Sequence, residues 1–254
     1  MLIAQRALTP EIMDGSDFTP AELSKNLADI RLYHRLTGGL AALLRAIGAL
    51  TRGIPEGGRL SALDVGAGSA DIASLVASWM AHRGFRPSVV ASDLNLRMLR
   101  VAAQGNGAGR RAGRVVRCAA DGRALPHRDA AFDVAYSCLM LHHLDDEAIG
   151  GVLAEMKRVT RLGFVVLDLR RSVLALASVW ALTRLTSRNR LTLNDGPLSV
   201  RRSLTLEETL SCARRGGLGE SSPPRSNGGG LAVRRDGLAR LILTFRHAEP
   251  RGAS

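Results

Sequence analysis

Apolar segments of strand length alternate with helical patterns between residues 58 and 170, and this alternation constrains the fold more than any other feature of the sequence. The apolar segments are LSALDV, SVVASD, RVVRCAA, FDVAYSCLML and GFVVLDL, and helical spacing follows in residues 70–82, 95–103 and 146–161. Strands that are apolar throughout are typical of a parallel sheet covered by helices on both faces. The sequence therefore predicts an α/β fold whose binding site lies at the carboxyl ends of the strands.

A helical region is predicted before this alternating core. Residues 19–50 have helical spacing, and Thr19 with Glu22 forms a capping-box pattern around a proline at the first helical position. The pair Gly38-Gly39 interrupts the pattern. We predict that residues 1–57 form an N-terminal helical cap and residues 58–254 form the core.

The alternation of strand and helix patterns ends after residue 169. We predict an apolar helix over residues 172–187, an irregular connector over 187–202, and a helix that begins with a second capping box at Thr205 and ends at Gly216. The segment ARLILTFR is predicted to be the last strand. Residues 172–204 form an insertion with two open interpretations: a lid over an apolar acceptor, or a segment that packs on the sheet edge.

The glycine-rich loop in residues 61–73, SALDVGAGSADIA, departs from a dinucleotide-binding loop. Gly66 and Gly68 fit that pattern, but Asp71 stands where the third glycine is expected and Asp64 precedes the loop. Two carboxylates repel phosphate groups and suit a ligand with cationic groups instead. S-adenosylmethionine has an ammonium, a sulfonium and an uncharged adenosine, and its close approach to the backbone requires small residues.

Two further acids follow the next strands. Asp93 ends the segment VVASD, where an acid can accept both hydroxyls of a ribose, and Asp121 follows the third strand in VVRCAADG. Together with LHHLDD after the fourth strand, this series resembles class I S-adenosylmethionine-dependent methyltransferases. The group that is most similar includes ubiquinone/menaquinone-type and other small-molecule methyltransferases. The resemblance covers roughly residues 58–170, with a looser match at 199–218.

The resemblance implies a Rossmann-like, doubly wound, mostly parallel seven-stranded sheet with an antiparallel last strand. It also implies cofactor contacts for a set of residues near the strand ends: Asp64, Gly66, Ala67, Gly68, Asp71, Asp93, Leu94, Asp121, Gly122, Ser137 and Leu139. In this set Asp93 matches the ribose-binding acid, and Asp121 with Gly122 matches the adenine-binding turn. The sequence departs from the family at Ala70, where glycine is common and alanine is tolerable if φ is negative.

Each acid also has a purely structural interpretation. Asp64 can cap the turn that follows it, Asp93 can cap a helix, and Asp121 can belong to an ordinary Asp-Gly turn. Asp71 can cap the helix or neutralise an arginine. These alternatives stay open at the level of sequence.

His142 and His143 are the candidate catalytic residues. A methyl transfer to a hydroxyl acceptor requires alignment and removal of a proton, and a histidine beside the acceptor has a suitable ordinary pKa. One of two adjacent side chains must point away, and structural roles for both are the alternative. Tyr33 and His34 in the N-terminal helical region can either close over the cofactor or pack in the core.

The net charge of +12 suggests nucleic-acid binding at first sight, but the composition opposes it. Of the 35 basic residues only Lys25 and Lys157 are lysines, the arginines are spread along the chain, and aromatic residues make up only 4%.

Three scattered cysteines form no metal-binding pair, and we expect no metal. No apolar run reaches the about 18–20 residues of a membrane span or the pattern of a signal peptide, so we expect a cytoplasmic protein.

The acceptor is the least determined part of the prediction. An apolar insertion and a basic surface suit a lipophilic phenol, quinone or polyketide-type acceptor. We expect methylation on an oxygen or a carbon of this molecule. One version of the hypothesis has the acceptor presented at a membrane surface. Nucleic acid is disfavoured as a partner. The alternatives are methylation of RNA or protein, favoured if arginines converge on the cofactor mouth, and a non-catalytic partner protein of the same fold. The sequence carries no signal for an oligomeric state.

Overall fold

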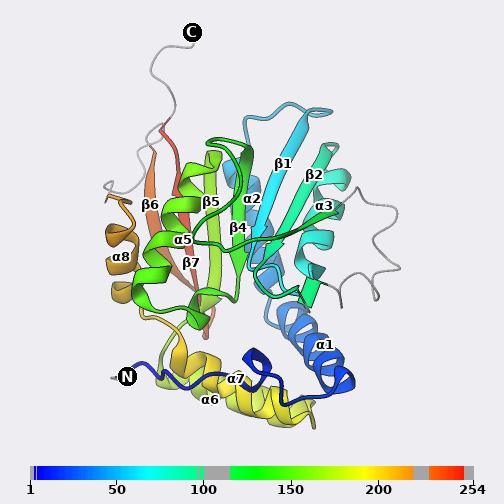
Figure 1. The fold of residues 1–254 in the computed structure, drawn as a ribbon, viewed down its shortest axis with the longest axis vertical. Coiled ribbons are helices and arrows are strands. Elements are labelled where there is room, and N and C mark those ends of the chain that lie inside the picture. The colour runs from blue at the N-terminus through cyan, green and yellow to red at the C-terminus, as the bar shows by residue number, and fades with distance from the viewer. Residues whose placement is uncertain (1–2, 4, 97, 100–114, 220–228, 249–254) are drawn as a thin grey trace.

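A computed structural model describes residues 3, 5–96, 98–99, 115–219 and 229–248 (Figure 1). Seven strands form one sheet in the order β3-β2-β1-β4-β5-β7-β6. The strands are β1 (Arg59–Val65), β2 (Arg86–Asp93), β3 (Val115–Ala119), β4 (Phe132–Cys138), β5 (Thr160–Leu169), β6 (Gly230–Asp236) and β7 (Arg240–Arg246). The strand β7 pairs antiparallel with β5 and with β6, and the other neighbouring strands pair parallel. The predicted fold class is confirmed.

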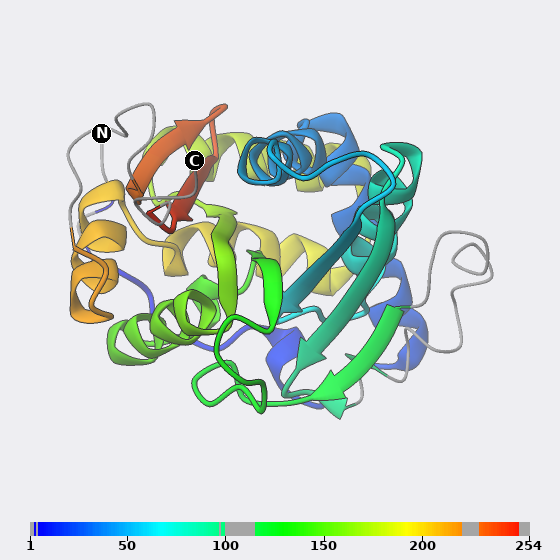
Figure 2. The same ribbon diagram turned by 90° about the horizontal axis from the view of Figure 1, so that it is seen from above.

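Helices cover both faces of the sheet because its central strands are apolar on both sides. The helices α2 (Gly39–Leu50) and α3 (Asp71–His82) pack on one face, and α5 (Asp146–Arg158) and α8 (Leu206–Arg215) pack on the other (Figure 2). The helix α2 lies within residues 1–57, the predicted cap, yet Leu43 and Ile47 are fully buried in the core against the sheet. Packing therefore places α2 with the core.

The remaining helices lie across the carboxyl ends of the parallel strands (Figure 1). These are α1 (Pro20–Leu36), α6 (Val173–Thr186) and α7 (Arg190–Arg202), and they contact one another through α7. A short 3-10 helix, η1 (Ile12–Asp14), also packs on α7. This layer covers the edge of the sheet where binding was predicted.

Both predicted capping boxes are confirmed. Thr19 accepts a hydrogen bond from Glu22 N while the Glu22 side chain accepts one from Thr19 N, and Thr205 with Glu208 repeats the arrangement at α8.

The predicted helix over residues 95–103 falls largely outside the described residues. Among the described residues, no helix has the length and apolar character needed to cross a membrane.

The connector predicted over residues 187–202 is wrong, because most of it is the helix α7. Asn189 caps this helix by accepting a hydrogen bond from Leu191 N, and Pro197 lies inside it. The Gly196-Pro197 pair reads as a turn signal, but a Cβ at Gly196 would lie 2.8 Å from Thr183 Cγ2. The glycine therefore permits close packing of α7 on α6, a tertiary requirement that outweighs helix propensity.

Candidate active site

A cavity of about 240 Å³ lies between the carboxyl ends of the strands and the layer formed by α1, α6 and α7. On the sheet side it is lined by the loop of Gly66, Ala67, Gly68 and Ser69, and by the segment after β4 that contains Leu139. On the opposite side its wall comes from the three covering helices and from Glu11. A ligand in this cavity would therefore contact the glycine loop and the insertion together.

The glycine loop has the backbone that its sequence predicts. Gly66 and Gly68 have φ values of +73° and +52°, and a Cβ at Gly66 would lie 2.3 Å from Met140 Cγ. The amides of Gly66 and Ala67 both donate to the carbonyl of Ser92, at 2.9 Å each. The loop is thus fixed to the end of β2, and its atoms form the floor of the cavity.

Ala70 also has a positive φ, of +55°, so the condition that alanine adopts a negative φ here is wrong. The side chain is fully buried at the N-cap of α3. A left-handed conformation costs a non-glycine residue about 1–2 kcal/mol, and burial of one methyl group offsets about 0.8 kcal/mol of that strain. Ala70 is therefore a strained member of the loop.

We expect Ala70→Gly to change the free energy of unfolding by less than about 1 kcal/mol, because relief of strain offsets the lost methyl group. The matched control is Ala73→Gly, which removes an equally buried methyl group from the interior of α3 and should destabilise by more than about 1 kcal/mol. Urea unfolding of both variants makes the comparison. Equal losses would show that Ala70 is not strained.

Asp93 links the glycine loop to the turn after β2. Its Oδ2 accepts a hydrogen bond from Gly68 N and its Oδ1 accepts one from Asn95 N, both at 2.7 Å. Because each carboxylate oxygen can accept a further hydrogen bond, these contacts leave capacity for two ligand hydroxyls. The geometry thus accommodates both the ribose-binding and the capping interpretation of Asp93.

Asp64 is buried beneath the loop, with 1% of its surface exposed. Burial raises the pKa of Asp64 to about 8, an effect that the neighbouring hydroxyl of Tyr136 opposes and the charge of Asp93 reinforces. Its Oδ2 has no hydrogen-bond partner within the described part of the chain. At neutral pH this carboxyl group is therefore mostly protonated, whereas the sequence argument treated it as charged.

Asp71 forms an ion pair with Arg31 of α1, with 2.6 Å between Oδ2 and Nη1. The same oxygen accepts a hydrogen bond from Ser69 Oγ at 2.7 Å. The structure thus realises the open alternative in which Asp71 neutralises an arginine. Both partners line the cavity, so the pair connects the glycine loop to the covering helix.

The other predicted cofactor residues divide by location. Leu139 has a φ of +55° and lines the cavity, but Leu94, Asp121, Gly122 and Ser137 do not line it. Asp121 is bound by Arg123, whose Nε and Nη2 donate to the carboxylate, and its pKa is held below the ordinary value by that side chain. Ser137 is fully buried at the end of β4, and its Oγ has no partner among the described residues.

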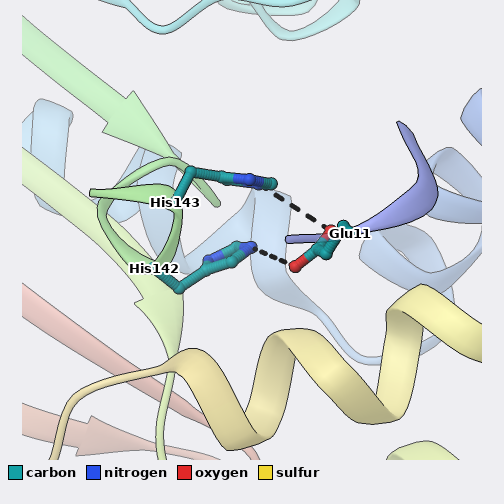
Figure 3. A group of neighbouring side chains, drawn as sticks. All are labelled: Glu11, His142 and His143. Atoms are coloured by element: carbon teal, nitrogen blue, oxygen red, sulfur yellow. Dashed lines mark ion pairs between the residues drawn. The ribbon is translucent and has the colours of Figure 1, made fainter. Parts of the chain in front are cut away.

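His142 and His143 line the far end of the cavity, on the 3-10 helix η3 (Leu141–His143). Both rings point toward Glu11, with His142 Nε2 at 3.6 Å from Oε1 and His143 Nε2 at 4.0 Å from Oε2 (Figure 3). His142 Nδ1 lies 2.7 Å from Oδ1 of the buried Asp168. Burial alone would raise the pKa of Asp168, but His142 lowers it below the ordinary value.

Sequence reasoning missed Glu11, Asp168 and Arg31. Asp168 had a detectable signal, since it ends a buried strand whose carboxyl end faces the predicted site. Glu11 and Arg31 had none, because only the folding of the N-terminal segment across the strand ends brings them to the cavity. Tyr33 and His34 also line the cavity, and burial lowers the pKa of His34 to about 4.

Comparisons with known proteins agree with this geometry. Residues 62–163 match the family model described as a methyltransferase domain, Methyltransf_25. No curated protein matches the chain in sequence.

Solved structures are similar over most of their length. A SAM-dependent methyltransferase from Aquifex aeolicus aligns with a TM-score of 0.58 and 18% identity, covering 91% of this chain and 99% of that one. The plantazolicin methyltransferase BpumL, solved with a triazolic desmethylPZN analog and SAH, aligns with a TM-score of 0.62 and 11% identity, covering 90% of this chain and 90% of that one. The magnesium protoporphyrin IX methyltransferase from Synechocystis, solved with SAH, aligns with a TM-score of 0.54 and 14% identity, covering 92% of this chain and 90% of that one. At these identities the likeness concerns the fold.

Proposed function

We infer that this chain, whose residues 62–163 match a methyltransferase domain and which has the α/β fold of such enzymes, is a class I S-adenosylmethionine-dependent methyltransferase. We propose that it methylates an oxygen or carbon of a small aromatic or lipophilic molecule. The observation that carries the proposal is the cavity. It adjoins the glycine loop, is largely apolar, and has in its wall the polar group Glu11, His142 and His143, named here its polar end.

The residues around the glycine loop suit the cofactor in shape and charge. The loop carries no side chain at Gly66 or Gly68, both of which line the cavity, and Asp64 beneath it has an Oδ2 without a partner among the described residues, so backbone and a polar atom are available to a cationic ligand. When bound, S-adenosylmethionine supplies a methyl group on a sulfonium. We propose that Asp93 accepts the ribose hydroxyls and that Arg31 binds the carboxylate of the methionine moiety, while Asp121 and Gly122 border the adenine.

The cavity wall supports a lipophilic acceptor. Beyond the glycine loop it is formed mainly by apolar side chains of the covering helices and nearby loops: Leu27, Ile30, Met98, Leu139, Val179 and Leu182. We propose that α6 and α7 serve as the lid over this acceptor. An apolar wall holds an aromatic body, and the polar end then orients the atom to be methylated.

His142 is placed to orient that atom. The carboxylate of Asp168 beside Nδ1 favours the tautomer with its proton on Nδ1, which leaves Nε2 with a free lone pair. We propose that Nε2 of His142 accepts a hydrogen bond from an acceptor hydroxyl, and that His143 and Glu11 complete this polar end.

The arginines give little support to RNA or protein as acceptor. Among the described residues, those that line the cavity are Arg31 and Arg240, and each is neutralised by an aspartate, Asp71 and Asp236. The basic charge near the cavity is therefore compensated locally. The non-catalytic alternative gains no support from the last part of the sheet, where a regular strand, β6, begins at Gly230 and pairs with β7.

Contact with a membrane surface stays a prediction. The helix α6 exposes an apolar face, with Leu174, Trp180 and Leu185 each more than half exposed. Such a face beside the lid supports delivery of a lipophilic acceptor from a membrane surface or a partner.

A methyl-transfer screen tests the proposal. The purified protein with radiolabelled S-adenosylmethionine should methylate a member of a panel of phenols, quinones and aromatic polyketides, and His142→Gln should lower that rate by about 100-fold or more, since orientation and proton removal are lost together. Bulk tRNA and a peptide mixture serve as competing acceptors. Labelling of tRNA or peptide alone would contradict the small-molecule acceptor.

A further inference from the structure

Three metal-ligating side chains from distant parts of the sequence meet at the polar end of the cavity. Glu11 precedes η1, whereas His142 and His143 belong to η3 after β4. The donor atoms that they offer all lie within 4.8 Å of one another. Figure 3 shows both imidazole rings directed at the carboxylate from the same side.

Each imidazole also has a carboxylate near its other nitrogen. His142 Nδ1 forms a hydrogen bond with Asp168 Oδ1 at 2.7 Å, whereas His143 Nδ1 lies 2.9 Å from Asp14 Oδ1 without hydrogen-bond geometry. The carboxylate of Asp168 holds the proton of His142 on Nδ1 and presents the Nε2 lone pair, as is usual for histidines that bind metals. The Nε2 atoms of both rings lie toward Glu11.

The position of Glu11 is itself fixed. Its Oε1 accepts a hydrogen bond from Ser199 Oγ at 2.7 Å, and the amides of Ile12 and Met13 donate to the carboxylate of Asp195 in α7. Glu11 is therefore held against the cavity by the covering layer, in the manner of a preorganised ligand.

The cluster has more negative than positive charge. Three carboxylates surround the two imidazoles, those of Glu11, Asp14 and Asp168, and the arginine that pairs with one of them is Arg202, at 3.2 Å from Asp14. Glu11 is only 3% exposed, and the ion pairs recorded for it among the described residues are with the imidazoles. A buried carboxylate requires a cation or a proton, and a bound metal ion meets that requirement.

We propose that Glu11, His142 and His143 bind a divalent transition-metal ion at the polar end of the cavity. Two imidazoles and one carboxylate with open positions form a donor set typical of catalytic Zn²⁺ and non-haem Fe²⁺. Bonds of about 2.0–2.2 Å in a tetrahedral site place donor atoms about 3.3–3.6 Å apart. The imidazole nitrogens lie 3.6 and 4.0 Å from Glu11, within a donor group that spans no more than 4.8 Å, so the side chains must move closer together around an ion.

This site deepens the proposed function, on which its role in catalysis rests. The three ligands line the cavity, so an acceptor that offers a phenolate or keto oxygen would be held by the ion, and this bond would replace the hydrogen bond from the acceptor hydroxyl to Nε2 of His142. A divalent ion favours the deprotonated form of a coordinating hydroxyl group, which is the more nucleophilic form. The proposed acceptors are therefore molecules with an accessible oxygen atom that can coordinate the metal ion.

The test is a titration of chelator-treated, tag-free protein with Co²⁺, followed by visible absorption, and with Zn²⁺, followed by calorimetry. We expect one ion per chain with micromolar affinity or better, and a rise of the melting temperature with Zn²⁺. His142→Gln and His143→Gln should each weaken binding at least about 100-fold, and Asp168→Asn about 10–100-fold. His82→Gln, a surface variant on α3, should bind as wild type does.

Two results would overturn the site: no Co²⁺ absorption from folded wild-type protein, or equal binding by wild type and the His142→Gln/His143→Gln double variant. The wild-type measurement does not depend on whether a variant folds. The titration contains neither S-adenosylmethionine nor acceptor, so its failure leaves the proposed methyl transfer standing. Conversely, failure of the acceptor screen leaves the metal site standing if the ion binds.

Discussion

Asp93→Ala is expected to weaken binding of S-adenosylmethionine by about 100- to 1,000-fold. The substitution removes the acceptor that holds Gly68 N at 2.7 Å, so the glycine loop loses its anchor at the end of β2. On our assignment it also removes the partner of the ribose hydroxyls. Hydrogen bonds to a charged group contribute about 1.5–3 kcal/mol each, and two losses at the lower end of that range, about 3–4 kcal/mol together, correspond to this loss of affinity.

Calorimetry with S-adenosylmethionine and S-adenosylhomocysteine measures the effect. Asp129→Ala is the matched control, because it removes an aspartate that is 80% exposed and pairs with Arg158 rather than with the glycine loop. Wild-type affinity in the control with loss in Asp93→Ala supports the assignment. Equal binding by wild type and Asp93→Ala would refute it, because neither the loop nor the ribose would then depend on this side chain.

Asp64→Asn is expected to stabilise the unliganded protein while it weakens cofactor binding. Burial raises the pKa of Asp64 to about 8 in the folded state, against an ordinary value of 3.8. Between these two pH values the folded state binds more protons than the unfolded state, so stability falls as the pH rises. The penalty is absent below pH 4 and is complete above pH 8. Asparagine carries no such penalty, and the expected gain at pH 8.5 is on the order of a few kcal/mol.

Urea unfolding at several pH values measures this prediction. The difference in unfolding free energy between Asp64→Asn and wild type should grow from pH 4 to pH 8 and then level off. The same variant should bind S-adenosylmethionine more weakly, since a cationic ligand favours the ionised form of Asp64. Cofactor affinity of the wild type should therefore rise with pH toward 8, and this dependence should be lost in the variant. A gain in stability that does not vary with pH would contradict the assigned pKa.

Local patterns predicted the parts of the fold that depend on neighbouring residues. Apolar strands and the capping boxes at Thr19 and Thr205 each follow from a few consecutive side chains. The same reasoning failed at α7, where a Gly-Pro pair has the local pattern of a turn but packs as a helix on α6. It also failed at Ala70, whose strained φ is imposed by the loop around it.

For the candidate site as well, the local features could be predicted from the sequence and the long-range contacts could not. Local sequence patterns predicted the sheet, the cofactor loop and the acids that follow the strands, because the periodicity of side chains and the conformational freedom of glycine act over short stretches of chain. Long-range packing brings Glu11 to His142 and His143, pairs Arg31 with Asp71, and lays α6 and α7 over the cavity. These contacts join residues far apart in the chain, and no local pattern encodes a meeting that depends on how the whole molecule packs.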